Sequence, residues 1–158
     1  MSFEITTEFL EKLTSYIEDS KNKSIISLFE EMHYADVAEI LDELSFDKVV
    51  YIIKLLDSEK TSAVLMELDE DIREKILQNL SAKEIAEEVE ELDSDDAADI
   101  IGELSEERQE AVMSQIEDEE QVKEIEELLT YDEDSAGGLM AKELVKVNEN
   151  WSVLKCVR

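Results

Sequence analysis

Apolar side chains recur along this chain with a period of twelve residues. One set of positions is apolar without exception: Leu44, Leu56, Leu68, Leu80, Leu92, Leu104, Ile116 and Leu128. Three positions before each member stands a second apolar residue, from Leu41 in the first repeat to Ile125 in the last. Apolar residues three apart lie on one face of a helix. Each repeat therefore predicts one short helix with a buried face.

Residues that favour helix starts follow the same pattern. The residue directly after each position of the first set is Ser, Asp or Glu in seven of the eight repeats: Ser45, Asp57, Asp69, Ser81, Asp93, Ser105 and Glu117. Ser and Asp oxygens accept hydrogen bonds from the first unpaired N–H groups of a helix, and Ser81 with Glu84 fits a capping box. We therefore predict helices of about two turns, separated by tight corners. Residues 7–19 and 24–32 are expected to form starting helices that cap the stack.

Helices of two turns are unstable alone, so their stability must come from stacking on neighbours. The predicted fold class is all-α, a superhelical solenoid over residues 1–130. The pattern changes at Tyr131, and Gly137-Gly138 marks a break. Residues 144–147 predict a strand and residues from Trp151 a helix. Because one strand and one helix cannot form a stable domain, we expect residues 131–158 to be a junction and the incomplete start of a second domain.

Charge narrows the possible functions. The chain carries 44 acidic and 15 basic residues, a formal net charge of −29. Such a surface repels nucleic acid and anionic membrane and attracts cations. The single cysteine, Cys156, excludes an internal disulfide and suits a reducing cytosol. The sequence contains no signal-peptide pattern and no apolar run long enough to span a membrane. No set of catalytic residues can be assembled from it, so we expect no enzyme activity.

The acidic residues concentrate in the last third of the chain. Between Glu84 and Asp134 there are 23 acidic residues and only two basic ones. If Asp93 caps a helix, Asp95 and Asp99 share one face of it, and two such carboxylates suit a hard divalent cation such as Mg²⁺. The alternative is that Asp95 and Asp96 stand there because acids favour a helix N-terminus. Asp99 lies further into the helix, where this explanation is weaker.

A second acidic pattern nearly fits an EF-hand calcium loop. It runs from Asp132 and Asp134 through Gly137 to Glu143. Ala136 lacks a side-chain oxygen at the fifth position, and a strand rather than a helix is predicted to follow. We therefore do not expect a general calcium-binding protein. His33, the only histidine, is expected to be a cap or surface residue.

Several segments resemble one family. The sequence YxxDSAGGLM at residues 131–140 resembles the junction that enters the first CBS domain of MgtE-type magnesium transporters. The segments HYADVAEILDEL at 33–44 and DDAADIIGEL at 95–104 are similar to helical repeats of that family. Residues 145–147 and 152–156 resemble the first strand and helix of a CBS module, although Cys156 stands where the family usually has a small residue. We interpret Cys156 as a core residue.

The resemblance implies a function that the charge pattern alone does not. It implies a homodimeric membrane protein whose sensor consists of this helical domain and CBS modules of the same chain. The sensor would lie on the cytoplasmic side of the plasma membrane, in bacteria the inner membrane. High Mg²⁺ would hold the pore shut by binding between acidic domains. It assigns weak regulatory Mg²⁺ contacts to Asp95 and Asp99, with Asp96 beside them.

A different class of function stays open. Helical solenoids also serve as protein-interaction scaffolds, which bind partners along a concave surface without any metal. A scaffold needs exposed aromatic or apolar anchors on its repeats. Aromatic residues make up only 6% of this chain, and those within the repeats, such as Phe46 and Tyr51, are scattered.

Overall fold

The computed structural model describes residues 5–132 and 135–143. Within these residues the regular elements are helices, and no strand is found among them. The helices are α1 (Thr7–Glu18), α2 (Asn22–Phe29), α3 (Tyr34–Asp42), α4 (Phe46–Ile53), α5 (Ser58–Glu67), α6 (Glu70–Gln78), α7 (Ala82–Val89), α8 (Ser94–Gly102), α9 (Glu106–Met113) and α10 (Glu119–Leu128). The predicted all-α solenoid of two-turn helices is confirmed for this part of the chain.

The predicted helix starts are nearly all correct. The N-cap residues of α4 to α9 are Ser45, Asp57, Asp69, Ser81, Asp93 and Ser105. The Ser81–Glu84 capping box forms, with hydrogen bonds of 2.7 and 3.2 Å. The start predicted at Glu117 is wrong by one residue, because the Asp118 carboxylate accepts the Glu120 N–H at 2.8 Å and caps α10.

His33 is also a cap. It precedes α3, and its Nδ1 accepts the N–H of Ala35 at 3.3 Å. An imidazole used in this way is a local structural group, which agrees with the expectation from its position before a helix.

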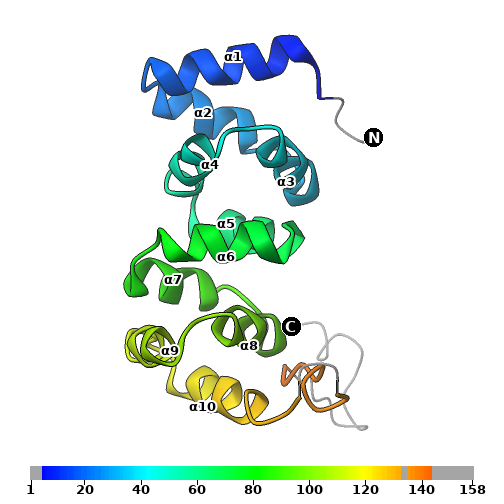
Figure 1. Ribbon diagram of the computed structural model, residues 1–158, viewed down its shortest axis with the longest axis vertical. Coiled ribbons are helices and arrows are strands. Elements are labelled where there is room, and N and C mark those ends of the chain that lie inside the picture. Colours follow the sequence, from blue (N-terminus) through cyan, green and yellow to red (C-terminus); the bar gives the residue numbers. More distant parts are fainter. Residues whose placement is uncertain (1–4, 133–134, 144–158) are drawn as a thin grey trace, which may run out of the picture.

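The helices stack in chain order along the long axis of the molecule, from α1 at one end to α10 at the other (Figure 1). Alternate helices make the main contacts: α3 packs on α5, α5 on α7, α7 on α9, and α8 on α10. The structural repeat is therefore a pair of helices, twice the period of the sequence. Consecutive helices also make contacts at the two ends of the stack, α1 with α2 and α8 with α9.

The two apolar positions of each repeat differ in how deeply they are buried. The positions three before each corner are almost all 0–2% exposed: Leu41, Ile53, Leu65, Leu77, Val89, Ile101 and Ile125. The twelfth-residue positions lie at or just beyond the helix ends, and several, such as Leu44 and Leu56, are only partly buried against the core. The helical positions are thus the most deeply buried, and the corner positions complete the core at its edge.

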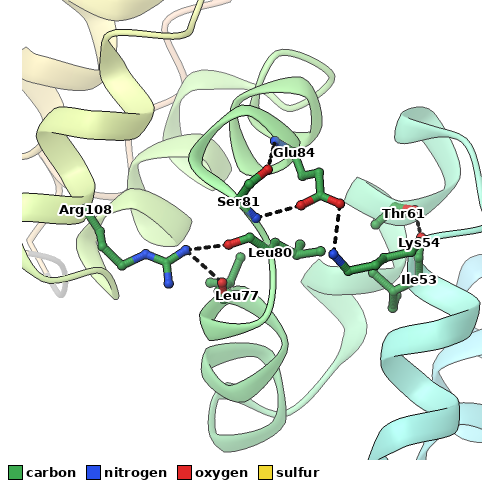
Figure 2. A network of polar contacts seen from close by, with 8 residues as sticks. All are labelled: Ile53, Lys54, Thr61, Leu77, Leu80, Ser81, Glu84 and Arg108. Carbon is green, nitrogen blue, oxygen red and sulfur yellow. Dashed lines mark hydrogen bonds and ion pairs between the residues drawn. The ribbon is translucent and has the colours of Figure 1, made fainter.

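Long polar side chains fasten one corner to a helix further along the chain. Arg108 in α9 donates to the carbonyl oxygens of Leu77 and Leu80 at 2.9 and 2.8 Å (Figure 2). Gln121 in α10 donates in the same way to Val89 and Leu92, at 3.1 Å each. The last carbonyl groups of a helix lack partners within it, so these bonds satisfy them and tie α9 to the end of α6 and α10 to the end of α7.

The second predicted unit cannot be compared with the structure. The strand expected at 144–147, the helix expected from Trp151 and the core position expected for Cys156 lie outside the described residues. In the part of the chain that the structure describes, every helix is too short or too polar to cross a membrane.

Candidate functional site

The predicted metal-binding acids lie on helix α8. Asp95 and Asp96 stand in its first turn and Asp99 in the next, and all three are partly exposed. The opposite face of the helix carries Ala97 and Ile101, which are buried in the core. Because the apolar face is fixed, the spacing of four residues brings Asp95 and Asp99 to one side, as predicted.

An arginine from helix α6 also belongs to this site. Arg73 forms a salt bridge with Glu103 at the end of α8, and its Nε lies 2.8 Å from Glu103 Oε1. Both side chains are mostly buried, at 13% and 12% exposed. Although burial acts to lower it, the pKa of Arg73 is raised by Glu103 first and then by the charges of Asp99 and Glu70. No Lys or Arg lies near Asp95 and Asp99 in the sequence, but the fold brings Arg73 of α6 to Asp99.

The carboxylates of α8 repel one another. The pKa of Asp96 is raised, first by burial and then by the charges of Asp95 and Asp93. Arg73 opposes this shift, and Glu143 adds to it. Crowded carboxylates have a raised pKa because each disfavours the charged form of its neighbours. A bound cation relieves the same repulsion.

A groove of about 360 Å³ opens beside these residues. Asp99 and Glu103 line it from α8, Glu70 lines it from α6, and Tyr131 and Gly138 line it from the junction. The Oε2 atom of Glu103 is buried and has no hydrogen-bond partner among the described residues. The groove therefore gathers acidic groups from two helices where the chain leaves the solenoid.

A divalent cation fits this arrangement only in part. Asp95 and Asp99 offer carboxylate oxygens, which Mg²⁺ accepts together with retained waters. Among residues 5–132 and 135–143, however, no three His, Cys, Asp or Glu side chains converge closely enough to hold a metal ion. The assignment of Asp95, Asp96 and Asp99 as metal ligands stays a prediction, and it requires oxygens from a second surface.

The last residue of the near-EF-hand pattern caps a helix. Glu143, at the twelfth position of that pattern, accepts hydrogen bonds from the N–H of Ser94 at 2.8 Å and from its hydroxyl at 3.2 Å. Its carboxylate thus caps α8 from 49 residues away. Sequence analysis missed this contact, because nothing in the local pattern pairs Glu143 with Ser94.

The comparison with known families settles the kind of domain. Residues 32–134, well over half of the chain, match the family described as the MgtE intracellular N domain. The chain belongs to the MgtE intracellular N domain family. The matched residues cover α3 to α10, so the MgtE region begins after the two starting helices. This family is a domain of magnesium transporters and not of enzymes.

Two solved structures share the fold. One is the soluble part of a magnesium transporter, with a TM-score of 0.81 and 20% identity, which covers 95% of this chain and 59% of that one. The other is the cytosolic domain of the Mg²⁺ channel MgtE in complex with ATP, with a TM-score of 0.81 and 28% identity, which covers 94% and 60%. The chain thus spans about three-fifths of each solved structure. No curated protein sequence matches it.

Proposed function

We propose that this chain is a Mg²⁺-sensing regulatory domain of an MgtE-type magnesium transporter or channel. Mg²⁺ binds at the acids of α8 and stabilises the compact arrangement of the sensor, which holds the pore closed. When Mg²⁺ falls, repulsion between carboxylates loosens the sensor. Family membership supports the transporter part of this proposal, and the charge of the chain supports the sensing part.

The observation that carries the proposal is the crowding of carboxylates at α8. Asp96 lies beside Asp95 and Asp93, and burial, followed by their charges, raises its pKa. A ligand shifts an equilibrium only through its different affinity for the two states. Mg²⁺ has this difference here, because the compact state holds the acids together and the loose state does not.

The incomplete ligand set predicts the partner. Asp95 and Asp99 supply two carboxylates, and a Mg²⁺ ion with only these and water ligands binds weakly. We propose that a CBS module of the same chain supplies the remaining oxygens. We also propose that the parent is a homodimer, attached to the membrane through another part of the protein, with this domain on the cytoplasmic side.

Thermal unfolding against MgCl₂, with NaCl matched for ionic strength, tests the sensing step. At ten times the dissociation constant, Mg²⁺ is expected to add about 1.4 kcal/mol and to raise the midpoint by about 3–6 °C beyond the salt control. An Asp95→Asn/Asp99→Asn double variant should lose this gain.

A matched control removes the same charge with the same spacing elsewhere. Glu106 and Glu110 lie four residues apart on α9 and are exposed, so Glu106→Gln/Glu110→Gln should keep the Mg²⁺ gain. If MgCl₂ and NaCl act alike on the unaltered chain, the acids only attract diffuse counterions, and the sensing proposal is wrong for this domain.

The scaffold alternative has weaker support. The described repeats expose few large apolar side chains, with Tyr34 and Phe46 on separate helices. Others lie at the junction end, at Leu129, Tyr131 and Leu139. This distribution offers no row of anchors along the solenoid, which a scaffold would need.

A further inference from the structure

The first turn of α8 is capped by a distant residue. Asp93 occupies the N-cap position, yet its side chain makes no capping hydrogen bond among the described residues. The carboxylate of Glu143 takes this place, with bonds to the N–H and the hydroxyl of Ser94. Ser94 is fully buried, so Glu143 is the group that satisfies a buried donor there. Losing such a partner is costly.

The neighbouring residue strengthens the same attachment. The N–H of Lys142 donates to Ser94 Oγ at 3.0 Å, and its ammonium group lies 2.7 Å from Glu127 Oε1 on α10. Residues 142 and 143 are therefore fastened to α8 and α10 together, two helices that pack on each other. In Figure 1 this segment, in orange, runs beside the end of the stack formed by these helices.

Two opposing electrostatic effects act on the Glu143 carboxylate. The positive end of a helix dipole favours a carboxylate at the start of α8. The acids of the same turn oppose it, because Glu143 and Asp96 repel each other and Asp93 and Asp95 stand beside Asp96. The strength of the Glu143 contact thus depends on how much negative charge the first turn of α8 carries.

We propose that Glu143 is a charge-sensitive clamp that fastens the junction segment to α8 and tightens when the acids of the first turn of α8 are neutralised. The clamp couples the α8 acids to the path by which the chain leaves the solenoid. Its regulation by Mg²⁺ rests on the function proposed above. Its dependence on charge does not, because substitution can neutralise the same acids without any metal.

Amide hydrogen exchange of the whole chain, measured by NMR without Mg²⁺, tests the clamp. The amides of Ser94 and Lys142 report on it directly, since each is a donor in the contact. Glu143→Ala should speed exchange at both amides by about tenfold or more, the usual effect of losing a hydrogen bond to a charged group. Asp96→Asn should slow both by about twofold.

Two controls separate the clamp from general changes in stability. Glu106→Gln removes one charge from the first turn of α9 and should leave both amides unchanged. The amide of Ala97, bonded to the Asp93 carbonyl within α8, should respond less than the two clamp amides in every variant. In a Glu143→Gln background the effect of Asp96→Asn should vanish, because the charge that it relieves is gone.

The outcomes distinguish the two proposals. If Asp96→Asn leaves the exchange of Ser94 and Lys142 unchanged, or if Glu143→Ala does, the clamp is refuted whatever Mg²⁺ does. If Asp96→Asn slows exchange and MgCl₂ does so too, except in Asp95→Asn/Asp99→Asn, both proposals are supported. If Asp96→Asn slows exchange and MgCl₂ does not, the clamp stands and the sensing function is contradicted.

Discussion

Two places where alternate helices meet, α6 with α8 and α5 with α7, each contain a partly buried carboxylate. We call them the α6–α8 seam and the α5–α7 seam, and the surroundings of the carboxylate differ between them. Between α6 and α8, Glu103 receives two hydrogen bonds from Arg73. Between α5 and α7, the charges that act on Glu88 come from other acids, Glu87 and Asp57 foremost. In both carboxylates the Oε2 atom is buried without a hydrogen-bond partner among the described residues. One seam thus contains an ion pair, and the other contains a group that favours a proton.

The difference predicts which stimulus each seam senses. Burial, followed by the neighbouring acids, raises the pKa of Glu88 from 4.5 to about 8. The α5–α7 seam should therefore respond to pH near neutrality. At the α6–α8 seam Glu103 is paired with Arg73, so we expect this seam to respond to cations that screen the acids around Arg73.

Substituting Arg73 tests this difference most strongly, because it removes the cation that distinguishes the α6–α8 seam from the α5–α7 seam. Arg73→Met keeps an unbranched side chain but leaves Glu103 buried and without its ion-pair partner, beside Asp99 and Glu70. Breaking a buried pair by removing one partner costs about 3–5 kcal/mol, and since both side chains stay slightly exposed we expect about 3 kcal/mol. Urea unfolding at pH 7 measures this loss.

An exposed pair provides the matched control. The Lys54 Nζ atom lies 2.9 Å from Glu84 Oε1 (Figure 2). Their side chains are 41% and 38% exposed. Lys54→Met should cost less than about 1 kcal/mol, as exposed ion pairs usually do. Equal losses in the two variants would show that burial does not set the strength of the Arg73 contact.

Neutralising Glu88 sharpens the comparison from the other side. A carboxyl whose pKa is raised on folding stabilises the fold fully below its unfolded value of 4.5, and this contribution is lost as pH rises through about 8. Between these limits the stability of the unaltered chain should fall. A pKa raised from 4.5 to about 8 corresponds to about 5 kcal/mol of stability, and the partial exposure of Glu88 reduces this. Glu88→Gln should remove the decline, so between pH 5 and pH 9 it should lose at least about 1–2 kcal/mol less stability than the unaltered chain.

Midpoints of thermal unfolding from pH 5 to pH 9 measure the slope. Glu11→Gln serves as the control, since Glu11 is exposed on α1. This control should keep the slope of the unaltered chain. A slope that survives in Glu88→Gln would mean that other groups carry the pH dependence and that the α5–α7 seam is not a proton site.

The local features of the fold were predictable from the sequence. Six of the seven N-cap positions follow from the residue after each apolar pair, because capping depends on neighbours three residues away. The stacking of α3 on α5 or α8 on α10 was not predictable. A twelve-residue period predicts the helices but does not indicate whether consecutive or alternate helices make the main contacts.

The candidate site divides in the same way. The presence of Asp95 and Asp99 on one helix follows from spacing alone. Arg73 and Glu143 do not, because they reach α8 from 30 and 49 residues away in the chain, at Glu103 and Ser94. Such contacts depend on how the helices are stacked, and no local pattern marks them.

The smallest expected effect concerns the other end of α7. There the Glu84 carboxylate accepts the N–H of Ser81 and contacts Lys54, and these bonds lower its pKa to about 2.

Ser81→Ala removes the hydroxyl that accepts the Glu84 N–H and should cost about 1 kcal/mol in urea unfolding. Ser105→Ala should cost only a few tenths of a kcal/mol, because the Ser105 side chain makes no capping bond among the described residues. Equal losses would mean that the position rather than the hydrogen bond stabilises these helices. A larger loss for Ser81→Ala would show that the hydrogen bond between the Ser81 hydroxyl and the Glu84 N–H stabilises the start of α7.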